Sequence, residues 1–324
     1  MLRLNRIAAL IGLTVSLGFA PVAVAAPEVT PLVSTQWLAD NLDRDDVLVV
    51  DIRSPFANSG REDYLKAHIP GAVWSEYPGY WRTDRDSIVG VLPSVEKLEA
   101  ALSELGVSDT KAVVIVPAGT TSSEFGAAAR IYWTLKYLGH DAVAILDGGH
   151  AAWVAENRPV ESGNVVPTGD MFIAEPRDAY LVQTSDVASK LNSSAVLVDG
   201  RPAAQFSGKE KHSKATRFGR IPDAVGLDQA VFYDEEKGRL KDRSEIASLV
   251  SPELADKSVE VVSYCNTGHW AATNWFVLHE VLGYENVSLY DESMVGWSQD
   301  ESLPMASERT TFDDIKAFLS GLLG

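Results

Sequence analysis

Short runs of consecutive apolar residues alternate along the chain with longer segments of helical character. In the first half these runs are Val47–Asp51, Ala112–Val116 and Val143–Leu146. Continuous apolar strands separated by helices are typical of parallel sheets that are covered on both faces. Each half is therefore predicted to be an α/β domain with a mainly parallel sheet and helices on both of its faces.

Five sequence blocks of the first half recur in the same order in the second half. The paired blocks are 32–38 with 181–187, 47–53 with 196–201, 68–72 with 220–224, 137–143 with 281–287, and 146–153 with 290–297. The nearly constant offset predicts a duplicated domain, with copies at 30–160 and 175–305 and a Pro- and Gly-containing join at 156–168. Hydrophobic residues at helical spacing predict a terminal helix over 306–324.

Residues 1–25 are predicted to be a secretory signal peptide. Two arginines precede an apolar stretch, Ile7–Phe19, and a small-x-small sequence places the cleavage site near Ala25. The apolar stretch is too short to span a bilayer comfortably, and an uncleaved anchor is the alternative. The mature chain is therefore expected to be periplasmic or secreted, with no membrane partner after cleavage.

The composition limits the classes of partner. The chain has 28 Lys and Arg against 45 Asp and Glu, a formal net charge of -17, which argues against nucleic acid as a partner. Its single cysteine cannot form an internal disulfide, although export favours paired cysteines. A mature chain of about 300 residues can bury a sufficient core without such bridges.

The single cysteine, Cys265, follows an apolar run that starts at Val259 and precedes a helix predicted over Ala271–Leu282. A free cysteine is often a small buried core residue. Its place on a polar connection favours a nucleophile instead, because N–H groups at the start of a helix stabilise a thiolate. The six residues Cys265–Trp270 can curl into an anion-binding nest of N–H groups, with Gly268 supplying a backbone angle that other residues resist.

Four motifs resemble those of the tandem rhodaneses, the thiosulfate and 3-mercaptopyruvate sulfurtransferases. They are Asp-x-Arg after a strand in each half, His-Ile-Pro-Gly-Ala at 68–72, Leu-Asp-Gly-Gly-x-x-x-Trp at 146–153, and a cysteine that opens a six-residue loop between a strand and a helix. The similarity runs from about Leu32 to Leu303. It implies a second domain whose cysteine forms a persulfide and a first domain of the same fold that lacks this cysteine.

The first half has no thiol in the matching loop. Counting from the strand places the counterpart of Cys265 near Gly119, and counting back from the helix places it near Thr121, so this loop is expected to be about two residues longer. The first domain is therefore expected to be structural and to form one wall of the active cleft.

Several residues beside the catalytic Cys265 are predicted to bind substrate. They are Arg201, Asn266, Thr267, Gly268, His269 and Trp270. In the resemblance, Arg201 falls on an arginine that contacts the anionic group of the donor; the alternative is a structural ion pair with Asp199. His269 is either a pH-dependent cation near the donor or an exposed loop residue, and Trp270 either touches substrate or packs at the start of the helix.

The roles of two further features are open. The basic run at 201–220 either gathers anionic donors at the cleft or is a solvated loop. His68 falls in a cleft-facing motif of the family, where a hydrogen bond that fixes a loop is its expected role. The residues between Cys265 and Trp270 match neither donor-specific pattern of the family, so the donor stays open between thiosulfate and 3-mercaptopyruvate.

The expected activity is sulfur transfer that needs no metal or organic cofactor. The Cys265 thiolate would take a sulfur atom from a small anionic donor and pass it to cyanide or to a thiol, including a protein thiol. A persulfide carrier or binding module that does not turn over is the alternative. A phosphatase or arsenate reductase is disfavoured, because phosphate needs an arginine six positions after the cysteine, where this chain has Ala271.

Overall fold

The computed structural model describes residues 26–310 and residue 313. The predicted signal peptide, 1–25, lies outside the described residues. Of the segment predicted as a terminal helix, residues 306–310 are described and are not helical, because Ala306 pairs with Arg220 in an antiparallel bridge. The rest of that segment lies outside the described residues, apart from residue 313.

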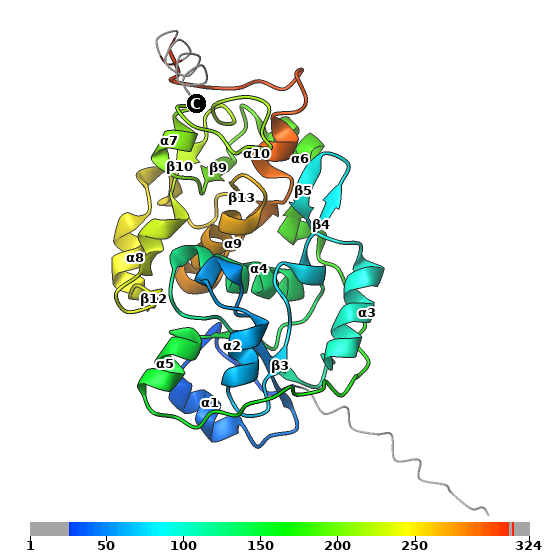
Figure 1. The fold of residues 1–324 in the computed structure, drawn as a ribbon. Helices are drawn as coiled ribbons and strands as arrows, with labels where there is room; N and C mark the ends of the chain where they lie inside the picture. The colour runs from blue at the N-terminus through cyan, green and yellow to red at the C-terminus, as the bar shows by residue number, and fades with distance from the viewer. Residues whose placement is uncertain (1–25, 311–312, 314–324) are drawn as a thin grey trace, which may run out of the picture.

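Each half of the chain contains a five-stranded parallel sheet (Figure 1). The first has the order β1 (Leu32–Val33), β7 (Val143–Leu146), β6 (Ala112–Val116), β2 (Val47–Asp51), β3 (Val73–Trp74). The second has the order β8 (Leu181–Val182), β14 (Val287–Tyr290), β13 (Val261–Tyr264), β9 (Val196–Asp199), β10 (Val225–Gly226). The two orders are the same, which agrees with the predicted duplication.

Helices connect the strands in both halves. In the first half they are α1 (Thr35–Asn41), α2 (Arg61–Lys66), α3 (Val95–Leu105), α4 (Ser122–Tyr137) and α5 (Gly149–Ala155). In the second half they are α6 (Thr184–Lys190), α7 (Ala203–Phe206), α8 (Arg243–Leu249), α9 (His269–Phe276) with a π-helical continuation (Val277–Leu282), and α10 (Ser293–Trp297). Five 3-10 turns lie between them, at Pro55–Ala57, Gly79–Trp81, Asp178–Tyr180, Gln229–Phe232 and Pro252–Leu254. No helix in the described part of the chain has the length and apolarity needed to cross a membrane.

Both faces of each sheet are covered by apolar packing. Along β6, Val113 and Ile115 point into one cluster of buried residues, whereas Val114 and Val116 point into another. This alternation follows from the period of two in a strand, and here both faces bury hydrophobic side chains. The predicted α/β class, with mainly parallel sheets, is confirmed.

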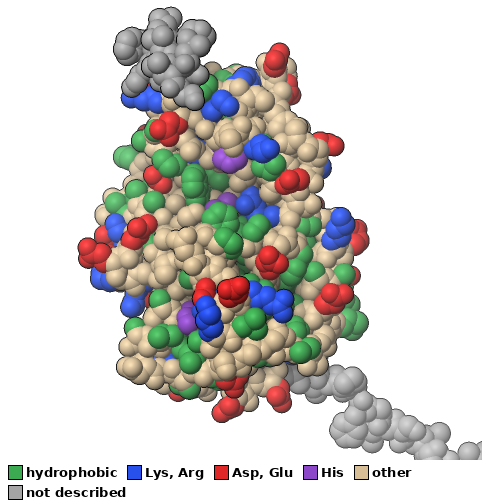
Figure 2. All heavy atoms as spheres, in the orientation of Figure 1, with side chains coloured by type: hydrophobic (Ala, Val, Ile, Leu, Met, Phe, Trp, Pro, Cys, Tyr) green, Lys and Arg blue, Asp and Glu red, His purple; other side chains and the backbone are tan. Residues whose placement is uncertain are grey.

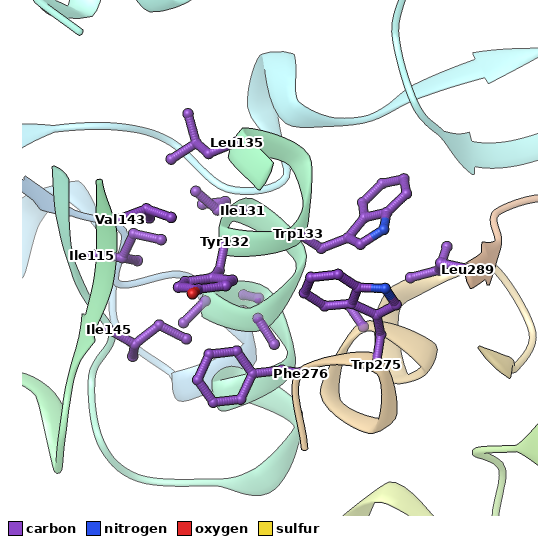
Figure 3. Packing of buried hydrophobic residues seen from close by; sticks show 14 of the residues in the cluster. Ile115, Ile131, Tyr132, Trp133, Leu135, Val143, Ile145, Trp275, Phe276 and Leu289 are labelled. Atoms are coloured by element: carbon purple, nitrogen blue, oxygen red, sulfur yellow. The ribbon is translucent and has the colours of Figure 1, made fainter. Parts of the chain in front are cut away.

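A single core joins the two domains. Helices α4 and α9 lie side by side in the middle of the molecule (Figure 1). The ring of Tyr132 on α4 meets Phe276 on α9 edge to face at 4.9 Å, and Figure 3 shows both helices packed against strand residues such as Ile115 and Leu289. Because this interface is hydrophobic and continuous with both cores, it fixes how the domains face each other.

Each domain also extends a β-hairpin over the other domain. The first domain contributes β4 (Thr83–Arg85) and β5 (Ile88–Val91), and the second contributes β11 (Tyr233–Asp234) and β12 (Arg239–Leu240). Arg85 forms an ion pair with Glu292, and the N–H of Leu92 donates to Asp291 at 2.6 Å. In the reciprocal position, Gly238 lies against the carbonyl oxygen of Gly119. The hairpin β4–β5 thus brings residues of the first domain to the loop after β13.

Candidate active site

Cys265 is the first residue after β13, and α9 begins at His269. It therefore lies beyond the carboxyl end of a parallel strand, where α/β proteins bind ligands. The residue is 1% exposed, yet it lines a cleft of about 370 Å³. The thiol is thus shielded from bulk water and still reachable from the cleft.

The helix after Cys265 starts earlier than Ala271, where it was predicted to begin. Gly268 adopts a left-handed conformation with φ 72° and turns the chain directly into α9 at His269. The predicted end at Gly283, with φ 79°, is confirmed, although the last residues are π-helical. His269 and Trp270 are therefore helical residues rather than loop residues.

Ser293 organises the loop. Its Oγ accepts hydrogen bonds from the N–H groups of Cys265 and Gly268, both at 3.1 Å, and donates to a carbonyl oxygen at 2.8 Å. The N–H groups of Asn266 and Thr267 have no acceptor among the described residues. The predicted nest is thus divided: Ser293 binds two of its N–H groups, whereas those of Asn266 and Thr267 are among the ones left for an anion.

Buried charged side chains of both domains contact the loop after β13. Arg130 of α4 forms an ion pair with Asp291, and both side chains are almost completely buried. Arg130 Nη1 also donates to the carbonyl oxygen of Gly268 at 3.2 Å. A Cβ at Gly268 would lie 2.5 Å from Arg130 Nη1 and 2.8 Å from Asp291 Oδ1, so this position has no room for a side chain.

The sheet register places Pro117 where the second domain has Cys265. In each sheet the aspartate of the repeated Asp-x-Arg motif pairs with the residue before the loop, which is Val116 in the first domain and Tyr264 in the second. Pro117 and Cys265 are therefore equivalent. The predicted absence of a thiol at the equivalent position is confirmed.

Backbone hydrogen bonds give the same correspondence. Carbonyl oxygens accept from N–H groups in matching pairs: Pro117 from His150, Ala118 from Ala151, Cys265 from Met294, and Asn266 from Val295. The predicted counterparts, Gly119 and Thr121, were wrong: the strand ends at Val116, the counterpart follows it directly, and the extra residue lies between that position and the helix. From strand end to helix cap, the first-domain loop is one residue longer, not two.

The carboxyl group of Glu124 fills the nest of the first domain. Its oxygens accept from the N–H groups of Ala118 at 2.5 Å and Gly119 at 3.2 Å. Burial raises the pKa of Glu124 to about 7. Ala118 and Gly119 correspond to Asn266 and Thr267, whose N–H groups are free. In the first domain, the two carboxyl oxygens of Glu124 accept from the N–H groups of Ala118 and Gly119. In the second domain, the equivalent N–H groups are available to an anionic ligand.

Both domains line the cleft. The first contributes Phe56, Pro78, Arg82, Asp84, Val89, Gly90 and Ser123, and the second contributes His212, Cys265, Asn266, Thr267, His269 and Trp270. Hydrophobic, basic and histidine side chains gather in the middle of the face shown in Figure 2. The expectation that the first domain forms one wall of the cleft agrees with this lining.

The cleft-lining residues of the first domain could not be identified from the sequence. They lie outside the five repeated blocks, so comparing the halves could not mark them. They reach the cleft through the β4–β5 hairpin, the turn at Pro55–Ala57 and the start of α4, which are tertiary arrangements.

His269 fits neither of its predicted roles. It is buried, so it is not an exposed loop residue, and burial together with the charge of Arg82 lowers the pKa of His269 to about 3, so it is not a cation at neutral pH. Its Nε2–H donates to the carbonyl oxygen of Ser123 at 2.8 Å, so Nδ1 accepts from the hydroxyl of Tyr77 at 2.7 Å. His269 therefore ties the second domain to the first as a neutral ring, with Phe56 stacked on it at 5.1 Å.

The neutral state of His269 has a consequence for stability. In the unfolded chain a histidine takes up a proton near pH 6.5, whereas the folded protein resists this until the pH approaches 3. Acidification below about pH 6.5 should therefore destabilise the fold. In His269→Gln, which keeps an acceptor and a donor, we expect a smaller loss of unfolding free energy between about pH 6.5 and pH 4. Urea denaturation across this range checks it, and an equally steep loss in the variant would contradict the assignment.

Trp270 and Asn266 have mixed roles. Trp270 packs at the start of α9, where its Nε1–H donates to Ser123 Oγ at 3.1 Å, and it also lines the cleft. Asn266 donates to Gln205 at 2.7 Å, and its buried Oδ1 has no partner among the described residues. The structure thus brings all five predicted loop residues to Cys265, and four of them line the cleft.

Arg201 does not line the cleft. Its guanidinium is 2% exposed and pairs with Asp199 at 2.5 Å, and it also donates to the carbonyl oxygen of Gly219 at 3.0 Å. The alternative of a structural ion pair is the one observed, and the predicted contact with the donor loses its support. The Lys and Arg residues of the run 201–220 are likewise absent from the lining, and Arg217 binds carbonyl oxygens of the chain after α10.

The counterparts in the first domain are also structural. Arg53 pairs with Asp51 at 2.8 Å. His68 is fully buried, and its Nδ1 lies 2.9 Å from the carbonyl oxygen of Tyr64, which agrees with the expected loop-fixing bond. Among the described residues, no group of three or more His, Cys, Asp or Glu side chains is arranged to hold a metal ion.

Comparison with known proteins assigns the family. The model of the rhodanese-like domain matches the chain twice, at residues 34–156 and 183–300. The chain belongs to the rhodanese family. This tandem rhodanese is 30% identical over 285 residues to 3-mercaptopyruvate sulfurtransferase of Escherichia coli K12, covering 85% of this chain and 98% of the relative. It is also 30% identical over 279 residues to a Mycobacterium tuberculosis protein named provisionally as a thiosulfate sulfurtransferase, covering 84% and 95%.

A solved structure supports the same assignment. The 3-mercaptopyruvate sulfotransferase SseA from Escherichia coli superposes with a TM-score of 0.70 at 28% identity, over 82% of this chain and 99% of that one. The resemblance to tandem rhodaneses is therefore confirmed, and the homologues of this chain are sulfurtransferases.

Proposed function

We propose that this rhodanese is a sulfurtransferase that carries sulfur as a persulfide on Cys265. The proposal is based on the position of the thiol. Cys265 lies in a cleft between the two domains, on a loop at the start of α9 whose N–H groups at Asn266 and Thr267 are free. Such a position favours a negatively charged sulfur. The relatives named above act in the same class of reaction.

The reaction has two displacement steps. The Cys265 thiolate attacks the outer sulfur of thiosulfate; the new S–S bond forms as the S–S bond of thiosulfate breaks, and sulfite leaves with its electron pair. The persulfide anion on Cys265 is then attacked at its outer sulfur by cyanide, which forms thiocyanate and restores the thiolate. Charge balances in both steps, and no outside oxidant or reductant is needed.

The loop stabilises the persulfide anion in this scheme. The N–H groups of Asn266 and Thr267 are free to donate to its terminal sulfur. Glu124 supports this role, because in the first domain its carboxyl oxygens take the two equivalent N–H groups. The low exposure of Cys265 limits attack by water and by unrelated thiols.

The donor class follows from the chemistry of the site and the relatives. Thiosulfate and 3-mercaptopyruvate both combine a transferable sulfur with an anionic group, and the acceptor is cyanide or a thiol, including a protein thiol. We also propose that the protein acts after export, to the periplasm or outside the cell, on the basis of residues 1–25.

Turnover tests the proposal against a carrier or binding module. Purified protein mixed with thiosulfate and cyanide is expected to form many equivalents of thiocyanate per Cys265, measured as the ferric complex. A burst that stops at one equivalent would show a carrier, and the absence of any thiocyanate with either donor would reject sulfur transfer.

A further inference from the structure

One basic side chain faces the cleft that contains Cys265. Arg82 is the single Lys or Arg among the lining residues, within the part of the chain that the structure describes. It comes from the first domain, at the point where the turn Gly79–Trp81 leads into β4. The predicted anion-binding residue, Arg201, lies outside the lining and is committed to Asp199.

The guanidinium of Arg82 is fixed at the catalytic loop. Nε donates to the carbonyl oxygen of Gly90 at 2.8 Å, and Nη2 donates to that of Thr267 at 2.5 Å. Nη1 has no carbonyl or carboxylate partner among the described residues. Gly90, with φ 73°, leaves the space that the guanidinium occupies, because a Cβ there would collide with Arg82. The hairpin is thus shaped to hold this side chain across the entrance to the loop.

The charge of Arg82 has no acidic partner. No carboxylate of the described residues forms an ion pair with it, whereas Arg130 and Arg201 each have a buried aspartate. Asp84 lines the same cleft, but its carboxylate accepts from the N–H of Gly90 at 2.9 Å. A half-buried guanidinium that has no carboxylate partner, near the Tyr77 hydroxyl and beside a shielded thiol, is suited to bind an anion.

We propose that Arg82 binds the acid group of the sulfur donor, so that the first domain supplies the anion site for chemistry on the second. The inference rests on the proposed sulfur transfer and adds the residue that selects the donor. Nη1 would donate to an oxygen of the sulfonate end of thiosulfate or of the carboxylate of 3-mercaptopyruvate. Because Nη2 is held by Thr267, two residues after Cys265, the acid group and the attacking sulfur meet at the same loop.

Two other roles for Arg82 lead to different results. If Arg82 only anchored the hairpin, its replacement would lower the stability of the fold and leave the half-saturating donor concentration unchanged. As a stabiliser of the thiolate, it would change the pH at which Cys265 reacts with an alkylating agent and leave the half-saturating donor concentration unchanged. Separate measurements of donor concentration dependence, alkylation and unfolding distinguish these roles.

The experiment follows sulfite release from thiosulfate without an acceptor, in the parent, Arg82→Gln, Arg82→Lys and Arg85→Gln. Arg85 is the matched control, because it lies in the same hairpin and pairs with Glu292 across the domain boundary but does not line the cleft. Arg82→Gln is expected to raise the half-saturating thiosulfate concentration by roughly 10- to 100-fold, the size of one charged hydrogen bond. Arg82→Lys should recover part of the loss, and Arg85→Gln should stay within about twofold of the parent.

Discharge of the loaded persulfide by cyanide is the second readout. Its rate in Arg82→Gln is expected to fall by much less than the half-saturating thiosulfate concentration rises, because the donor has left by then. Equal half-saturation in Arg82→Gln and Arg85→Gln would overturn the proposal, as would a shift confined to the alkylation profile. If the parent itself releases no sulfite, the proposed sulfur transfer fails, which is a separate outcome.

Discussion

Replacing Cys265 by serine is expected to lower thiocyanate formation by roughly 10³-fold or more, because a serine hydroxyl is a far weaker nucleophile than a thiolate and cannot form a persulfide. The chain has one cysteine, so no second thiol can substitute. Serine fills nearly the same volume in this buried position, and the N–H bond from Cys265 to Ser293 does not depend on the side chain. Fold and stability should therefore be close to those of the parent. Activity near the parent rate would show that the chemistry lies elsewhere.

A single methyl group at Gly268 is expected to damage both the fold and the reaction. Gly268→Ala adds a side chain at φ 72° and drives its Cβ against Arg130 and Asp291. The left-handed conformation and the clash together should lower the unfolding free energy by about 3 kcal/mol. The loop must also shift, so activity should fall by roughly 10²-fold, since small displacements of reacting groups have large effects. Urea denaturation and thiocyanate formation measure the two effects.

Gly283→Ala is the matched control for that variant. Gly283 ends the same helical segment with φ 79°, but nothing lies within 4 Å of the position of its Cβ. It carries the strain of the left-handed conformation without the clash, so the expected loss is about 1 kcal/mol with activity retained. Equal effects of the two substitutions would mean that the space around Gly268 does not matter.

The sequence was sufficient for the architecture because its signals are local and duplicated. Apolar runs such as Ala112–Val116 identify strands buried on both faces, and β6 shows this packing. The repeated blocks identify elements whose environments are the same in both domains. Trp153 and Trp297 illustrate this, since each is fully buried and donates its indole N–H to a proline carbonyl.

Side-chain roles at the cleft were harder to predict because they depend on contacts between domains. His269 was expected to be exposed or charged, but Tyr77 and Ser123 of the first domain bury it. Arg201 belongs to the repeated Asp-x-Arg motif, and its side chain turns inward to Asp199. Arg82 lies on a hairpin outside the repeated blocks, and only the folded chain shows that it reaches Thr267.

The first-domain residue that corresponds to Cys265 could also not be identified from the sequence alone. Counting along the sequence cannot tell whether an extra residue lies before or after the counterpart of Cys265, whereas the hydrogen-bond register settles it as Pro117. That register in turn matches Ala118 and Gly119, whose N–H groups Glu124 accepts, with Asn266 and Thr267 of the second domain.

Intact-protein mass spectrometry shows whether Cys265 becomes a persulfide. The parent incubated with thiosulfate or with 3-mercaptopyruvate, and then freed of donor, is expected to gain the mass of one sulfur atom. That gain should map to the peptide containing Cys265 and disappear after addition of cyanide, and Cys265→Ser should show no gain. An unchanged parent mass with both donors, or the same gain in Cys265→Ser, would contradict the account.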